Sequence, residues 1–220
     1  MRIGIICYPT FGGSGVVATE LGIELSKRGH HVHFIAYKKP VRLDTDLERI
    51  HFHEVHVPNY PLFHYQPYEL ALSSALVDMV RLHKIELLHA HYAIPHAYAA
   101  FMAKQMLAEL QINIPIVTTL HGSDITLVGS HPFYKPAVTF SINNSDVVTS
   151  VSKSLKHDTK DIFTIKREID VVPNFIDIQK YERLRNTCSR EQLVKPDERL
   201  ITHVSNCLLY TSPSPRDGTK

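Results

Sequence analysis

Residues 2–15, RIGIICYPTFGGSG, decide the fold class of this chain of 220 residues. The first part, Arg2–Tyr8, is apolar at nearly every position, as expected of a strand buried on both faces of a parallel sheet. The glycine turn Gly12–Gly15 follows, and apolar residues at helical spacing then predict a helix over Val16–Arg28, with Gly29 as its stop. A strand, a glycine turn and a helix in this order open an α/β unit.

The same alternation of short β-branched runs and longer helical patterns continues along the chain. We predict six further strands, at His31–Tyr37, Ile50–Val57, Glu86–Ala90, Ile114–Leu120, Asp146–Val151 and Glu168–Val172. We predict four further helices, at Tyr68–His83, Ile94–Leu110, Pro132–Asn143 and Lys153–Asp161. This order is typical of one parallel sheet wrapped by helices. The expected fold class is therefore α/β, a Rossmann-like parallel sheet with helices on both faces.

The composition is that of an ordinary globular protein, with 44% hydrophobic and 21% charged residues. The formal charge of +2 gives no electrostatic reason to expect nucleic acid or a membrane as a partner. Cys7, Cys188 and Cys207 fit neither a disulfide framework nor a zinc motif, and a reducing cytoplasm suits them best. The apolar run Ile3–Cys7 is too short for a signal peptide or a membrane span. The 15 histidines are scattered, so we interpret most of them as surface or core residues.

Unusual residues gather at one edge of the predicted sheet. In a sheet of this kind, ligands bind in the crevice outside the carboxyl ends of the strands. Glycine, histidine and other polar residues follow four of the predicted strands, in the segments Gly12–Gly15, His89–His96, His121–Asp124 and Asn174–Asp177. We therefore expect the functional site at this edge.

The glycine turn lets backbone N–H groups approach an anion closely, next to the positive end of a helix. Its pattern Gly13-x-Gly15-x-x-Ala18 also fits the dinucleotide fingerprint loosely, which expects an acidic residue about 20 positions later. The corresponding segment 36–39 reads AYKK and has no acid. Lys38 leaves an NADP-dependent oxidoreductase open as an alternative, and a tight turn without a ligand is open as well.

Two histidines, His89 and His91, alternate on a predicted strand and therefore share one of its faces. Such a pair could ligate a metal, but no cysteine or carboxylate close in sequence completes a coordination sphere. Polar contacts with a bound ligand are the favoured interpretation, and we expect no metal at the site.

The segment 118–124, TTLHGSD, ends a predicted strand in a histidine. Gly122 then bends the chain, so that His121 faces the crevice and can donate a hydrogen bond to a sugar hydroxyl or to developing charge. Asp124 could orient this histidine or cap the following turn. A plain helix cap by Ser123 or Asp124 would leave His121 unexplained.

Three segments in this order resemble landmarks of the retaining family-4 glycosyltransferases, which have the two-lobed GT-B fold. They are the GGSG turn at 12–15, HGSD at 121–124 and VPNFID at 172–177. The last segment alone reads only as a turn. In that family the amino-terminal lobe mainly holds the acceptor, and the carboxyl-terminal lobe mainly holds the nucleotide sugar.

Residues 7–17, 91–96 and 118–122 resemble more narrowly the members of the family that use L-malate as acceptor. This resemblance implies transfer of N-acetylglucosamine from UDP-GlcNAc to the malate hydroxyl with retention, the first step of bacillithiol biosynthesis. It implies a UDP-sugar-dependent hexosyltransferase with two small-molecule substrates and neither a cofactor nor a metal. A family-4 enzyme with a different acceptor remains an alternative, as does a non-catalytic binding module.

The resemblance also implies roles for individual residues. His121 would contact the transferred sugar and is the candidate catalytic residue. The candidate acceptor-binding residues are Ser14, Gly15, Tyr92, Thr118, Thr119 and Asn206. Gly13 and Gly15 would lie near the donor phosphate, and Asp124 and Asn174 are secondary candidates. A dicarboxylate acceptor suits this set, because N–H groups at a helix start and hydroxyls supply fixed hydrogen-bond donors.

The resemblance, which covers residues 1–206, divides the chain into parts. We expect 1–177 to form the acceptor-side domain, and 178–206 to form the interlobe segment with the first strand of the donor domain. The family continues after Asn206 with an aromatic-basic segment whose cations bind the donor diphosphate, whereas residues 207–220 read CLLYTSPSPRDGTK. We interpret this ending as a non-native disordered tail, with a natural one as the alternative. The chain is thus expected to be truncated at the start of the second lobe and inactive alone, with a homo-oligomer open for the full-length protein.

Overall fold

The computed structural model describes residues 1–43, 47–59, 61–62, 64–178 and 193–201. Met1–Asn174 and Phe175–Lys220 are separate units, and the described part of the second unit contains no helix or strand. The predicted interlobe segment 178–206 is described only in part. Asn206 and residues 207–220 lie wholly outside the described residues.

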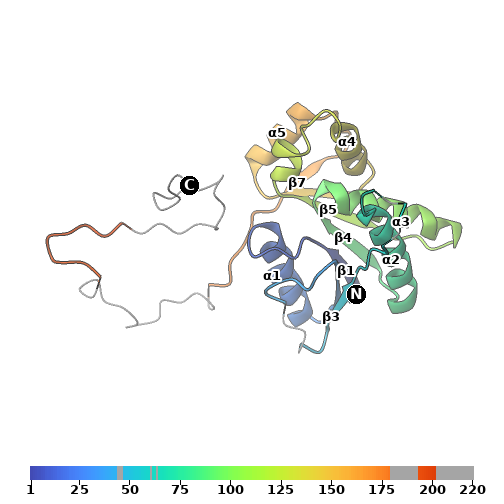
Figure 1. The fold of residues 1–220 in the computed structure, drawn as a ribbon, viewed down its shortest axis with the longest axis horizontal. Helices are drawn as coiled ribbons and strands as arrows, with labels where there is room; N and C mark the ends of the chain where they lie inside the picture. The colour runs from blue at the N-terminus through green and yellow to red at the C-terminus, as the bar shows by residue number, and fades with distance from the viewer. Residues whose placement is uncertain (44–46, 60, 63, 179–192, 202–220) are drawn as a thin grey trace. The chain divides into compact units, whose positions relative to one another are not determined.

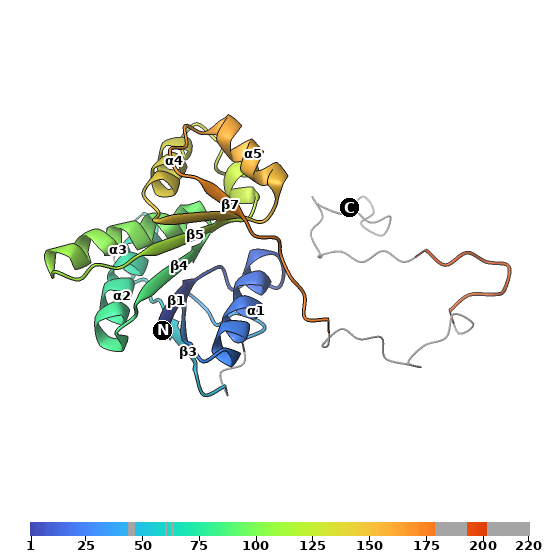
Figure 2. The ribbon, with the colours of Figure 1, turned by 180° about the vertical axis from the view of Figure 1, so that it is seen from behind.

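Seven parallel strands form one sheet in the order β3-β2-β1-β4-β5-β6-β7 (Figures 1 and 2). The strands are β1 (Arg2–Ile6), β2 (His31–Ala36), β3 (Ile50–Glu54), β4 (Leu87–His91), β5 (Ile116–Leu120), β6 (Val147–Ser150) and β7 (Ile169–Val171). The central strand β1 is buried at every position after Arg2, which is why it reads as an unbroken apolar run. The parallel sheet predicted from the sequence is confirmed.

Helices cover both faces of this sheet. They are α1 (Ser14–Lys27), α2 (Tyr68–His83), α3 (Tyr98–Glu109), α4 (Lys135–Asn143) and α5 (Lys153–Ile162), with short helical turns η1 (Ala93–Ala97) and η2 (Ser123–Leu127). Ala18 of α1 packs with Phe34, whereas the next strand residue, Ile35, packs with Leu76 of α2 and Leu107 of α3 on the opposite face. Side chains of α4 and α5 share a third cluster with residues of β5, β6 and β7. Among the described residues, no helix has the length and apolarity needed to cross a membrane.

Two helices start later than the sequence predicted. The helix expected over Ile94–Leu110 is interrupted, and α3 starts only at Tyr98. Pro95 has no N–H and disfavours helical backbone in the residue before it. Ile94 is accordingly extended, with φ −130° and ψ 142°. Likewise α4 starts after Pro132 rather than at it.

The order of the strands places the crevice. From β1 the chain passes outward to β2 and β3 on one side, then returns to β4 on the other side of β1. The direction in which strands are added to the sheet thus reverses between β1 and β4, and the loops after these two strands diverge. Open α/β sheets bind ligands at such a point. Because β5 pairs with β4, the loop after β5 borders the same crevice.

Candidate functional site

Two glycines shape the turn between β1 and α1. Gly13 precedes α1 with φ 61°, in the left-handed region that favours glycine. Gly15 lies against the preceding chain, because a Cβ there would collide with the carbonyl oxygen of Tyr8 and with Thr10. No side chain caps the first turn of α1. Its first N–H groups and the hydroxyl of Ser14 therefore lie at a helix end suited to an anion.

Tyr92 follows β4 in a backbone conformation that is uncommon for a residue other than glycine, with φ 90°. Its N–H donates to the carbonyl oxygen of Thr119 at 3.0 Å, and its hydroxyl shares a hydrogen bond of 2.9 Å with Ser123. Its ring stacks on His121, with centroids 5.4 Å apart, and meets the ring of Tyr8 edge-on at 5.3 Å. The loops after β1, β4 and β5 therefore meet at this tyrosine.

Asp124 fastens two of these loops together. The carboxylate, 2% exposed, accepts from the N–H of Ala93 at 3.0 Å after β4, and from those of His121 and Gly122 at 3.1 and 2.9 Å after β5. Burial raises the pKa of Asp124, while these hydrogen bonds oppose the shift. The carboxylate has neither of the two roles that the sequence left open, because it bonds the N–H of His121 and not its imidazole, and no side chain caps the following turn η2.

The histidines beside the crevice form a hydrogen-bonded set. His91 Nδ1 and His121 Nε2 are 2.8 Å apart, and His96 Nδ1 donates to the carbonyl oxygen of His91 at 2.6 Å. Burial, with a smaller contribution from neighbouring imidazoles, lowers the pKa of His121 to about 4. The ring is therefore neutral near pH 7. Its Nδ1 makes no hydrogen bond to another described residue and is available to a ligand.

The two threonines of β5 point to opposite sides of the sheet. Thr119 shares hydrogen bonds of 2.7 Å with His89 and 2.8 Å with Thr149. Thr118 is fully buried, and its hydroxyl pairs at 2.7 Å with Ser145. Successive strand residues face opposite ways, so the structure brings Thr119 to the histidine set and leaves Thr118 in the interior.

A cavity of about 620 Å³ opens beside Tyr92. Five tyrosines and two acidic residues contribute to its wall: Tyr8, Tyr68, Tyr92, Tyr98, Tyr134, Glu69 and Asp124. Among the described residues, three buried side-chain polar atoms lack a hydrogen-bond partner, namely Tyr68 Oη, His91 Nε2 and His96 Nε2. Since buried polar groups are normally paired, a polar ligand in the cavity could satisfy the hydroxyl of Tyr68.

Not every candidate from the sequence joins this cluster. Asn174 is exposed after β7, at the far edge of the sheet. Ser14 and Gly15 lie at the glycine turn and do not line the cavity beside Tyr92. The turn is connected to the cluster through Tyr8, which contacts Tyr92.

Residues 11–180 match the family described as Glycosyltransferase Family 4, a range that includes Tyr92, His121 and Asp124. The chain belongs to this family. The match confirms the resemblance carried by the GGSG, HGSD and VPNFID segments. It also removes the basis for an NADP-dependent oxidoreductase.

Two curated relatives differ in how much of the chain they match. The chain is 46% identical over 207 residues to the N-acetyl-alpha-D-glucosaminyl L-malate synthase of Bacillus anthracis, covering 94% of this chain and 54% of that protein. It is 29% identical over 126 residues to the putative teichuronic acid biosynthesis glycosyltransferase TuaC of Bacillus subtilis, covering 54% of this chain and 30% of that protein. The chain thus spans about half the length, or less, of these relatives.

Solved glycosyltransferase structures share the fold of this family-4 chain. Sucrose-phosphate synthase from Thermosynechococcus elongatus has a TM-score of 0.65 at 14% identity, over 90% of this chain and 54% of that chain. Anabaena HepE in complex with UDP and glucose has a TM-score of 0.61 at 14% identity, over 82% and 46%. These likenesses concern the fold alone, and they confirm the expected Rossmann-like class.

Three of the cavity tyrosines of this family-4 lobe were missed in the sequence, namely Tyr68, Tyr98 and Tyr134. Tyr68 and Tyr98 are the first residues of α2 and α3, and Tyr134 directly precedes α4. A tyrosine in such a position is usually a partly buried packing residue. The available signal was positional, because helix starts in this fold lie at the ligand-binding edge of the sheet.

Replacing Gly15 with alanine is expected to destabilise the lobe by about 3 kcal/mol, the upper end of the usual range for overpacking. The new Cβ collides with backbone of the β1 loop, which has less freedom to move than a side chain. Urea unfolding followed by far-ultraviolet circular dichroism measures the change, since the chain has no tryptophan.

Gly22→Ala is the matched control, because its Cβ would also collide, with the ring of Phe34 inside the core. Both variants should lose stability. Only Gly15→Ala should also weaken binding of an anion such as sulfate at the α1 terminus. Unchanged stability in Gly15→Ala would contradict the close packing of this turn.

Proposed function

We propose that this chain holds the acceptor in a retaining glycosyltransferase that moves N-acetylglucosamine from UDP-GlcNAc to L-malate, the first step of bacillithiol biosynthesis. The observation that carries the proposal is 46% identity over 94% of the chain to the Bacillus anthracis synthase, whose name contains both the sugar and the acceptor. The proposal includes a cytoplasmic location and no metal in the transfer step.

The geometry of the crevice supports an acidic acceptor. Malate carries two carboxylates, and the first N–H groups of α1 with the hydroxyl of Ser14 provide charge-assisted hydrogen bonds for one of them. The hydroxyl of Tyr92 and Thr119 Oγ1 are further donors near His121. A neutral His121 ring would then hydrogen-bond the transferred sugar through its open Nδ1.

The position of Asp124 supports a mechanism without a side-chain nucleophile. This carboxylate is the one nearest in sequence to His121, and its two oxygens already accept three backbone N–H bonds. A nucleophilic carboxylate must present an oxygen to the reacting carbon, whereas both oxygens of Asp124 are turned toward backbone N–H groups. Asp124 would therefore position the two loops while the acceptor hydroxyl attacks the sugar.

Titration calorimetry of the 220-residue chain with L-malate tests the proposal. We expect saturable binding of one equivalent, weaker binding of succinate, which lacks the accepting hydroxyl, and no binding of NADPH. Ser14→Ala should weaken malate binding about 10-fold or more, because a hydrogen bond to a charged group is worth about 1.5–3 kcal/mol.

A chain that ignores malate but binds a sugar or polyol would contradict the proposal. Such a result would favour a family-4 enzyme with a different acceptor, the second candidate, for which the 29% identity to TuaC is the relevant observation. Ser130→Ala is the matched control for Ser14→Ala. Ser130 hydrogen-bonds backbone of the η2 region and lies away from the glycine turn, so this variant should bind malate as the unmodified chain does.

A further inference from the structure

Histidines gather on one face of the sheet, away from the loops described above. His33 lies on β2, and His51 and His53 lie on the edge strand β3, where the parallel register aligns His33 with His51 and Ile35 with His53. Since alternate strand residues share a face, all three point to the side that α2 covers. The last residue of α2, His83, reaches the same place.

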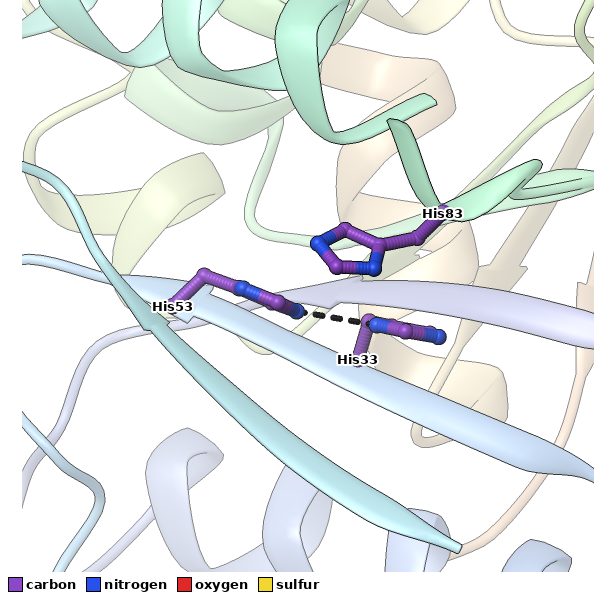
Figure 3. A group of neighbouring side chains, drawn as sticks. All are labelled: His33, His53 and His83. Carbon is purple, nitrogen blue, oxygen red and sulfur yellow. Dashed lines mark hydrogen bonds between the residues drawn. The ribbon is translucent and has the colours of Figure 1, made fainter. Parts of the chain in front are cut away.

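Three of these imidazoles face one another. Figure 3 shows His33, His53 and His83 converging from two neighbouring strands and a helix end. His33 Nδ1 and His53 Nε2 are 2.8 Å apart, and the ring of His83 has its centroid 4.9 Å from that of His33 and 4.5 Å from that of His53. One nitrogen from each ring lies within 4.8 Å of the other two.

This arrangement is close to a coordination sphere. Imidazole nitrogens bound to zinc at 2.0–2.1 Å in a tetrahedral site are about 3.3 Å apart. Small rotations of the three rings would bring their nitrogens to this spacing. His33 is buried, whereas His53 and His83 are half-buried and leave a route from solvent. A metal ion would replace the proton that His33 and His53 share.

The chemistry of the ligand set indicates which metals fit the cluster. Three nitrogen ligands without a carboxylate suit zinc, nickel or copper and not magnesium or calcium.

We propose that His33, His53 and His83 form a binding site for a divalent transition-metal ion, with water or His51 completing its coordination. His51 is in reach, since its ring centroid is 4.6 Å from that of His33. The ion would fasten the edge strand β3 and the end of α2 to β2. His33 lies in the amino-terminal half of its strand, whereas the glycosyltransferase crevice lies beyond the carboxyl ends, so the ion would act on stability and not on sugar transfer.

Zinc binding to the tag-free, EDTA-treated 220-residue chain tests the site. Calorimetry should give one equivalent of Zn²⁺ bound, and Zn²⁺ should raise the melting temperature, because a ligand that binds the folded state stabilises it. His53→Gln and His83→Gln should each weaken binding about 100-fold or more, since even the loss of a group that only orients a ligand costs 10–100-fold. His157→Gln is the matched control, an exposed histidine on α5, and should bind as the unmodified chain does.

Circular dichroism without metal must first show that each variant is folded. Imidazole nitrogen NMR of the unmodified chain gives a readout that needs no variant, with zinc-induced changes expected at His33, His53 and His83. The absence of saturable zinc binding would overturn the proposal. So would changes confined to His89, His91 and His121, or folded His53→Gln and His83→Gln variants that bind zinc as tightly as the unmodified chain.

Discussion

Asp124→Ala is expected to lower the stability of the Met1–Asn174 unit by about 4 kcal/mol, because one buried and two partly buried N–H groups lose their acceptor, and each unsatisfied buried group costs about 1–3 kcal/mol. The groups belong to Ala93, His121 and Gly122, so the loss falls on two loops at once. Malate binding should disappear with it, since Tyr92 and His121 would no longer be held together. Urea unfolding followed by circular dichroism measures the first effect, and calorimetry measures the second.

Two further variants separate the role of Asp124 in holding the two loops together from a general effect of losing an acid. Asp124→Asn keeps one acceptor oxygen and turns an amide toward an N–H group, so its stability should be intermediate. Asp78→Ala removes an exposed carboxylate from α2 and should change stability by about 0.5 kcal/mol at most. If Asp124→Ala were no less stable than Asp78→Ala, the fastening of the two loops would be refuted.

The second large effect is expected in acid, where the fold should lose stability steeply as the pH falls from 6.5 toward 4. Seven histidines have a pKa lowered chiefly by burial: His33, His51, His53, His89, His91, His96 and His121. Below pH 6.5 the unfolded chain takes up protons at these positions, whereas the folded chain takes them up only at a lower pH. The unfolded state therefore binds more protons, and stability falls with pH.

His96, which is buried, and His89, which is partly buried, indicate the size of the effect. The pKa of His89 and that of His96 are about 4 against an ordinary 6.5, so each costs about 3 kcal/mol by pH 4. A typical domain has a total stability of only about 5–15 kcal/mol. Asp124, whose pKa is raised, acts in the opposite direction, but it is a single group.

Urea midpoints measured at intervals between pH 7.5 and 5 check this expectation. The midpoint should fall continuously below pH 6.5 and recover when the sample is returned to pH 7.5. His89→Gln keeps a hydrogen-bonding partner for Thr119 and removes one titrating ring. The slope of stability against pH should therefore correspond to up to one proton fewer taken up on unfolding. A midpoint that stays constant from pH 7 to 5 would contradict the prediction.

The sheet was predictable because its strands are buried on both faces and read as short apolar runs between helical patterns. The proximity of Tyr92, His121 and Asp124 was equally predictable, since each follows one of two predicted strands that end at the same edge of the sheet. The alternation of side chains along a strand could have shown that the two threonines of β5 face opposite sides of the sheet. Thr118 is in register with the buried Leu120, so it points into the core.

What the sequence could not provide depends on long-range packing. His33, His53 and His83 are far apart along the chain, and only the register of β2 with β3 and the length of α2 bring them together. The cavity tyrosines had a positional signal at their helix starts, but their side chains line one cavity only because of how α2, α3 and α4 pack. Local patterns specify elements, whereas these clusters arise from how the elements dock.

The hydrogen bonds of Tyr92 and Asp124 have a consequence for anyone who wishes to redesign this lobe. The loop after β4 keeps its shape only while Thr119 of β5 accepts its hydrogen bond and the loop after β5 supplies Ser123 and the Asp124 carboxylate. Grafting either loop alone from a homologue would leave the other half mismatched. A chimera with altered substrate preference should therefore exchange residues 92–98 and 119–128 as a single cassette.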